Sequence, residues 1–295
     1  MLDTIVSPRV RSFDVDQGSL AVLVRDSAGA AVSGLSIGLA GPSTSLDEPT
    51  NDNGCVLWGY LTASSAYEIS FARAGWVNPA GTSAGGGPAT IVGDETTNAG
   101  YQFDRGAAIR ANFRTKRPGE DRLISTQPAI VRVDNGTGAG FSRTYDIGTS
   151  DSLDTSASGL LFPFANSYVV YADNCLSAKP AEPTSVALTP GSTVQAADVR
   201  LPALNITVKD RGVNVDNATV RVVTQCGTTY ERQTSGGLID DPGFPYATSG
   251  MTLCATDGER KRVLTNRANA DFDGLDVTLD VGTDGSIDTD LSTCP

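Results

Sequence analysis

The sequence contains no histidine among its 295 residues, and it has four lysines against eighteen arginines. The missing imidazole excludes Ser-His-Asp and Cys-His catalytic groups, and it excludes every metal site that needs a histidine ligand. No apolar run approaches the roughly 18 residues that a membrane-spanning helix requires. We therefore expect no membrane span in this chain.

Positive charge is also scarce, because 22 Lys and Arg residues stand against 34 Asp and Glu residues, for a net charge of −12. Nucleic-acid-binding proteins usually present a basic stripe, so we expect no nucleic acid partner. The acidic residues show no spacing that forces two carboxylates together for acid–base chemistry. We expect neither a catalytic residue nor a cofactor, and we interpret the chain as non-enzymatic.

The five cysteines include no C-x-x-C pair, which argues against zinc and thioredoxin-like sites. Cys226 and Cys254 each close a β-rich run, and their spacing predicts a disulfide between them. Cys175 and Cys294 remain open to a second pairing. Cys55 is expected to be a small buried apolar residue, since cysteine is common in protein cores.

Acidic residues gather near the end of the sequence, where hard oxygen ligands for calcium are available. Asp284, Asp288 and Asp290 are weak calcium candidates, because their stretch has the composition of a turn. An EF-hand loop needs a glycine at its sixth position and a glutamate at its twelfth, and this stretch does not provide both. An exposed acidic face is the simpler interpretation.

Hydrophobic residues make up 39% of the sequence and charged residues only 19%, which predicts a folded core. No segment of helical length shows helical periodicity, whereas alternating apolar residues recur. Residues 19–26 and 204–210 read as strands followed by a turn and a second strand, and residues 109–113 begin in a similar way. An aromatic corner before a short strand also recurs, at Phe162 and Phe244 among other places.

These recurrences predict an all-β chain of three tandem β-sandwich domains of the immunoglobulin-like or transthyretin-like class. The expected divisions are an extended lead over 1–17 and domains over 18–106, 107–202 and 203–295. Neither seam has a long Gly/Ser run. We therefore expect the domains to form an elongated array.

Three signatures in the first repeat carry a resemblance to a known family. They are the Asp-containing turn after residue 25, the run Thr50-Asn51-Asp52-Asn53-Gly54, and the closing stretch from Tyr67 to Trp76. Together they resemble the carboxypeptidase-regulatory-like domain, a transthyretin-like β-sandwich related to the Cna-type B repeat. The third repeat resembles its first half over 209–222, and the second repeat is the weakest match.

A narrower resemblance is to the exported region of actinobacterial prepilin-type surface proteins. It implies an extracellular location on the bacterial cell surface and a structural role in a pilus, a filament or an adhesin stalk. The implied partners are other surface or filament subunits through self-association, with a glycan or a host or cell-surface ligand as a further partner. The alternative function is a carbohydrate-binding accessory module of a secreted hydrolase.

An isopeptide bond and a glycan-binding aromatic face are two further features of such domains. Cna-type repeats often carry a Lys–Asn isopeptide bond, but residues 18–106 contain no lysine, and Lys209 adjoins Asp210 at a turn that suits a solvated side chain. Trp58 and Trp76 occupy signature positions, so core packing is favoured over an exposed glycan-binding face.

The cysteine pairing is directly testable. Peptide mapping of the unreduced protein should yield a fragment that joins Cys226 to Cys254 and that separates after reduction. Free thiols at both positions, or a bond from Cys254 to another cysteine, would refute this pairing.

Overall fold

A computed structural model describes residues 16–287, apart from residues 43, 116–128, 136–140, 149, 174–182, 193, 202–203, 225–226, 228, 241–248 and 272–275. The chain divides into two compact units, residues 1–106 and 107–295. Strands dominate both units, and α1 (Val281–Asp284) is a single helical turn. The prediction of an all-β fold built from sandwiches is confirmed.

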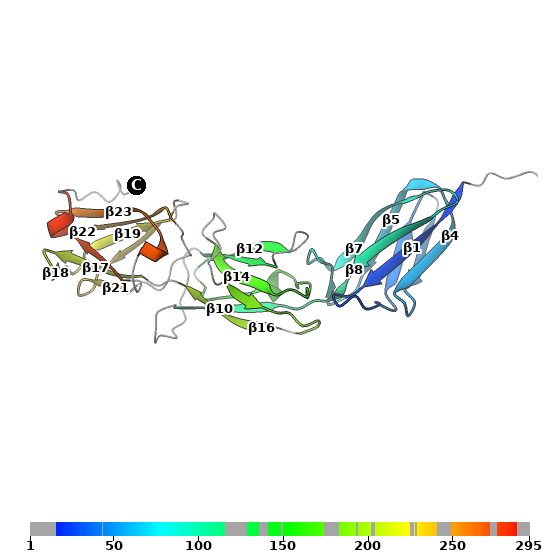
Figure 1. Ribbon diagram of the computed structural model, residues 1–295, viewed down its shortest axis with the longest axis horizontal. Coiled ribbons are helices and arrows are strands. Elements are labelled where there is room, and N and C mark those ends of the chain that lie inside the picture. The colour runs from blue at the N-terminus through cyan, green and yellow to red at the C-terminus, as the bar shows by residue number, and fades with distance from the viewer. Residues whose placement is uncertain are drawn as a thin grey trace, which may run out of the picture. The chain divides into compact units, whose positions relative to one another are not determined.

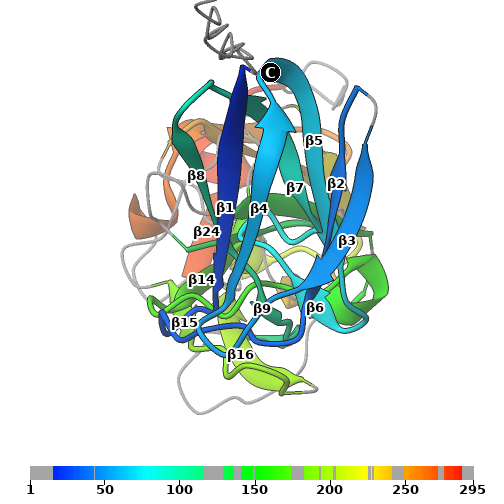
Figure 2. The ribbon, with the colours of Figure 1, turned by 90° about the vertical axis from the view of Figure 1, so that its right-hand side faces the viewer.

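Unit 1 is a sandwich of two sheets. One sheet has the order β4-β1-β8 and the other the order β3-β2-β5-β7, while a short β6–β9 pair lies apart from both. Figure 2 shows the two sheets beside each other. The strand bounds are β1 (Gln17–Arg25), β2 (Ser36–Ala40), β3 (Ser45–Pro49), β4 (Cys55–Thr62), β5 (Ser64–Ala72), β6 (Trp76–Val77), β7 (Ala84–Ile91), β8 (Thr96–Gln102) and β9 (Asp104–Arg105).

Unit 2 begins with a second pair of sheets, ordered β13-β10-β16 and β12-β11-β14-β15. Their strands are labelled in Figure 1 where space allows. The bounds are β10 (Ile109–Thr115), β11 (Ala129–Asp134), β12 (Ser142–Gly148), β13 (Ser152–Asp154), β14 (Tyr168–Asp173), β15 (Thr184–Val186) and β16 (Gln195–Leu201), with a 3₁₀ turn η1 (Thr155–Ser158) after β13.

The rest of unit 2 forms a third pair of sheets. In one sheet β17 is hydrogen-bonded to β18, β21 and β24, and the other has the order β20-β19-β22-β23. The bounds are β17 (Asn205–Asp210), β18 (Val213–Asn214), β19 (Thr219–Val223), β20 (Thr229–Gln233), β21 (Leu238–Asp240), β22 (Met251–Thr256), β23 (Lys261–Arg267) and β24 (Asp276–Asp280), with a 3₁₀ turn η2 (Asn269–Asp271) before β24.

The same topology recurs in all three pairs of sheets, which we call repeat one (β1–β9), repeat two (β10–β16) and repeat three (β17–β24). In each repeat the first strand pairs antiparallel with a middle strand (β4, β13 or β21) and parallel with a strand near the end of the repeat (β8, β16 or β24). We call this parallel pairing the terminal-strand pair of a repeat. It joins β1 to β8, β10 to β16 and β17 to β24.

Each repeat buries its own apolar cluster between its two sheets. In β1 burial alternates residue by residue, so that Leu20, Val22 and Val24 face the core. Phe113 and Tyr168 are fully buried in the cluster of repeat two, and Leu253 and Leu279 in that of repeat three. The separation of 107–202 from 203–295 as independent domains, and the elongated array, stay predictions.

A buried threonine joins a strand end to a nearby turn in repeats one and three, after β3 and after β20. The Thr50 hydroxyl accepts a hydrogen bond from the Leu35 amide at 2.9 Å and donates to the Val32 carbonyl at 2.6 Å. Thr234 makes the equivalent bonds to the Ala218 amide and the Val215 carbonyl. Repeats one and three therefore share this pair of side-chain hydrogen bonds as well as their strand topology.

A buried carboxylate joins the turn after β1 to β9 in unit 1. Asp104 is 3% exposed, and its Oδ2 accepts hydrogen bonds from the amide and the hydroxyl of Ser27, at 3.1 and 2.5 Å. Ser27 belongs to the turn after β1, whereas Asp104 begins β9, so these bonds join the start of the repeat to its end. The Arg105 amide also donates to Asp104 Oδ1, so loss of this buried acceptor leaves three donors unsatisfied.

We therefore expect Asp104→Ala to lower the free energy of unfolding of unit 1 by about 1–3 kcal/mol. Urea denaturation of the full chain can be followed by tryptophan fluorescence, because both tryptophans lie in unit 1. Asp47→Ala, which removes an exposed carboxylate on β3, is the control and should change the stability by less than about 0.5 kcal/mol. Equal effects of the two substitutions would contradict the role assigned to Asp104.

Candidate functional site

The calcium candidates are only partly described. Asp284 lies exposed at the end of α1, where its backbone carbonyl accepts a hydrogen bond from Arg262. Asp288 and Asp290 lie outside the described residues. Within the described part of the chain, no group of three or more acidic or cysteine side chains is placed to hold a metal ion. Calcium binding stays a prediction.

The cysteines differ in their surroundings. Cys55 is a free thiol of intermediate exposure, so the expectation of a buried residue was wrong. The alternation of β4 turns its neighbour Val56 to the core and leaves Cys55 on the outer side. Cys254 is fully buried on β22 and is not a free thiol. Cys226, Cys175 and Cys294 lie outside the described residues.

The register of repeat three sets a condition on the predicted disulfide. Thr252 pairs with Val223, the last residue of β19, while Cys254 pairs with Arg221 farther along the strand. A bond to Cys226 therefore requires the β19–β20 connection to fold back along β22, since the two Cα atoms of a disulfide lie within about 7 Å. The Cys226–Cys254 pairing stays a prediction.

The aromatic and lysine expectations can be compared with the structure. Trp58 is 6% exposed within the core of repeat one, and Trp76 packs against that core beside Phe103, with ring centroids 5.8 Å apart. The core-packing prediction is confirmed for both. Lys209 lies partly exposed on β17 at the turn, as its sequence context indicated.

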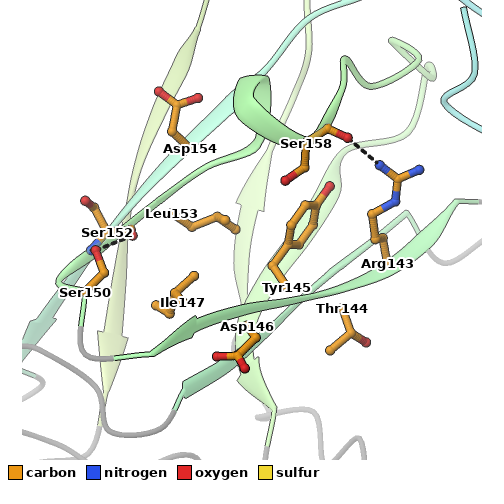
Figure 3. Close-up of a pocket in the computed structure, with 10 residues that line it drawn as sticks. All are labelled: Arg143, Thr144, Tyr145, Asp146, Ile147, Ser150, Ser152, Leu153, Asp154 and Ser158. Atoms are coloured by element: carbon orange, nitrogen blue, oxygen red, sulfur yellow. Dashed lines mark hydrogen bonds between the residues drawn. The ribbon is translucent and has the colours of Figure 1, made fainter.

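The candidate site is a cavity of about 530 Å³ at one open side of repeat two. It lies between β12, an edge strand of one sheet, and β13 with η1, at the edge of the other. On β12 the residues Arg143, Tyr145 and Ile147 share one side by strand alternation, and Figure 3 shows Tyr145 and Ile147 directed toward Leu153 and η1. Ile147 and Leu153 give the cavity an apolar floor.

Tyr145 is the unusual member of this cavity. Its side chain is 6% exposed, and its buried Oη finds no acceptor for its proton among the described residues. Burial raises the pKa of the Tyr145 hydroxyl, and the charge and hydrogen bonding of the nearby Arg143 guanidinium oppose that rise. By contrast the Oη of Tyr168, in the same core, donates to the Phe162 carbonyl at 2.9 Å.

Arg143 lies at the mouth of the cavity. Its Nη1 donates to the Ser158 carbonyl of η1 at 3.2 Å, and its guanidinium lies 4.8 Å from the centre of the Phe141 ring. Figure 3 shows the Arg143 guanidinium and the Tyr145 hydroxyl both directed toward Ser158. The site thus gathers hydrogen-bond donors at one end of an apolar floor.

Asp154 lines the opposite rim, and its charge is compensated. Its Oδ2 accepts from Arg110 Nη2 at 2.8 Å, and its Oδ1 accepts from the hydroxyl and the amide of Ser156. The Ser156 hydroxyl, followed by Arg110, lowers the pKa of Asp154 to about 2. Figure 3 shows the Asp154 carboxylate directed away from Tyr145.

Sequence reasoning missed this site. The alternation Arg143-Thr144-Tyr145-Asp146-Ile147 was sufficient to place three side chains on one side of a strand. It contained no signal for what would lie opposite them, because β13 and η1 meet β12 only through the sandwich fold. A second hollow of about 390 Å³ in unit 1 includes Tyr60, which is 88% exposed.

No family model matches this chain, and no curated protein matches its sequence. Among solved structures it is similar to the Bacillus anthracis TIE protein, with 15% identity over 89% of this chain and 50% of that chain, and a TM-score of 0.30. It is similar to BcpA, the major pilin subunit of Bacillus cereus, with 10% identity over 90% of this chain and 99% of that chain, and a TM-score of 0.28. It is also similar to GBS52, the minor pilin of Streptococcus agalactiae, with 12% identity over 62% of this chain and 95% of that chain, and a TM-score of 0.26.

This chain spans about half the length of the TIE protein that it matches. These TM-scores are too low to assign a fold or a function to this chain. None of the helices in the described residues is long and apolar enough to cross a membrane.

The low pKa of Asp154 has a consequence for acid stability. Because its folded pKa of about 2 lies below the unfolded value near 3.9, Asp154 stabilises the folded state above about pH 4, and this contribution disappears as the pH falls toward 2. Asp154→Asn should cost about 0.5–1 kcal/mol at pH 7 and progressively less toward pH 2. Thermal unfolding of both proteins from pH 7 to pH 2 measures the difference, and a difference that does not depend on pH contradicts the assignment.

Proposed function

We propose that this chain is a non-enzymatic structural protein of the bacterial cell surface, which bears load in a pilus, a filament or an adhesin stalk. The observation that carries the proposal is the terminal-strand pair, which recurs in all three repeats. We further propose three domains, over 18–106, 107–202 and 203–295.

Parallel pairing of the first and last strands determines how a pulling force acts on a repeat. The chain enters at the start of the first strand and leaves at the end of the last strand, and in a parallel pair these points lie at opposite ends. Tension therefore pulls the two strands past each other along their axes. All hydrogen bonds between them are loaded together and cannot open one after another.

The length of the terminal-strand pair differs between repeats. Seven residue pairs join β1 to β8, from Ser19–Thr96 to Arg25–Gln102, and seven join β10 to β16. Five join β17 to β24. Repeat three is therefore expected to yield first under tension.

The connections between repeats are short, which favours transmission of force. Only residues 106–108 lie between β9 and β10, and residues 202–204 between β16 and β17. Connections of three residues can extend only by about 10 Å, so tension on one repeat is transmitted almost directly to the next. This supports the expected elongated arrangement, and we propose self-association with other surface subunits as the mode of use.

Single-molecule pulling from the two ends of the full chain tests the proposal. We expect three separate unfolding events, with the lowest force for repeat three. Thr278 is an exposed residue in the middle of β24 and pairs with Thr207 of β17. Thr278→Pro removes its backbone N–H and fixes its φ, so it should weaken the terminal-strand pair and lower the unfolding force of repeat three.

Thr265→Pro is the matched control, because Thr265 is an exposed threonine on β23, outside the terminal-strand pair. It should leave the unfolding force of repeat three close to that of the unaltered chain. Equal loss of force in both variants, or unfolding of all repeats without resistance, would contradict a load-bearing role. Antibody labelling of intact cells tests the surface location separately.

A further inference from the structure

We propose that the cavity between β12, β13 and η1 is a binding site for a carboxylate carried on a short apolar stem. The inference does not depend on the load-bearing role, because it concerns the open side of repeat two and not a terminal-strand pair. Two features of the cavity carry it: a buried hydroxyl without an acceptor among the described residues, and a cation beside it over an apolar floor.

The first feature is the Tyr145 hydroxyl. A buried hydroxyl that makes no hydrogen bond destabilises the folded state, so buried polar groups are nearly always paired. Tyr145 is 6% exposed, and its Oη finds no acceptor among the described residues, although phenylalanine would fill the same space. An oxygen atom of a bound ligand supplies the missing acceptor.

The second feature is Arg143, whose guanidinium has five N–H donors. One nitrogen holds the Ser158 carbonyl at 3.2 Å, and Ser158 itself is exposed at the end of η1. A ligand carboxylate that enters beside Ser158 accepts from Arg143 and from the Tyr145 hydroxyl at the same time. Ionic hydrogen bonds of this kind are stronger than neutral ones.

The charges around the cavity favour a carboxylate over a cation. Asp146 lies on the opposite side of β12 from Arg143 and Tyr145, and Figure 3 shows it directed away from them. Asp154 is already paired with Arg110 at 2.8 Å. Arg143 is therefore the charge that faces the Tyr145 end of the cavity, while Ile147 and Leu153 lie where an apolar stem would pack.

The stem and carboxylate could belong to a free short-chain acid or to the C-terminus of a peptide. Hexanoate and N-acetyl-glycyl-leucine are probes for these two sources. Titration of the full chain, followed by amide NMR shifts at Arg143, Tyr145 and Leu153, should give a Kd of about 1 mM for whichever source fits, as expected for so small a ligand. Hexanamide, which lacks the charge, should bind at least about tenfold more weakly.

Two tyrosines of the same core form a matched pair of variants. Tyr145→Phe should reduce probe binding about tenfold while the ligand-free protein keeps its melting temperature or gains a few degrees, since an unpaired hydroxyl is removed. Tyr168→Phe should lower the melting temperature, because it removes the bond to the Phe162 carbonyl, and should leave probe binding unchanged. Arg143→Gln should weaken binding about tenfold or more.

Several outcomes would overturn the proposal. One is a loss of thermal stability in Tyr145→Phe as large as that in Tyr168→Phe, because the Tyr145 hydroxyl would then have a partner within the protein. Others are undiminished probe binding in Tyr145→Phe and Arg143→Gln, or no shift with either carboxylate. Binding of methyl glucoside in place of both carboxylates would assign the cavity to a neutral sugar and reject the carboxylate.

Discussion

Parallel hydrogen bonding between the first and last strands of each repeat is the constraint on which the rest of the structure depends. In repeat one it brings residues 19–25 beside residues 96–102, while β2, β3, β5 and β7 from the intervening chain form the second sheet. The apolar sides of the two sheets then face each other and form the core. The Asp104–Ser27 bonds depend on this closure, since they join the turn after β1 to the segment that follows β8.

The same architecture leaves open sides where the edge strands of the two sheets face each other. In repeat two these edges are β12 and β13, and the cavity lies between them. A sandwich can vary the side chains of such edges without disturbing its terminal-strand pair. Mechanical and binding properties can therefore reside in the same repeat on different strands.

Tyr145 and Tyr168 are similarly buried, but their hydroxyls differ in hydrogen bonding. Both are buried in one apolar cluster, and burial raises the pKa of both hydroxyls. Tyr168 donates to a carbonyl six residues earlier, at the aromatic corner before β14, whereas the Tyr145 hydroxyl lies at an open side and finds no acceptor among the described residues. Burial alone does not distinguish a structural tyrosine from one available to a ligand.

The sequence alone determined the all-β class, the recurrence of the strands and the core positions of Trp58, because alternation with a period of two is a local property of the chain. It misplaced Cys55, since one position of register decides which side of a strand a residue occupies. The parallel partner of each first strand and the meeting of Arg143, Tyr145 and Leu153 were decided only by the tertiary structure, because no local pattern specifies which distant segment pairs with a strand or lies opposite it.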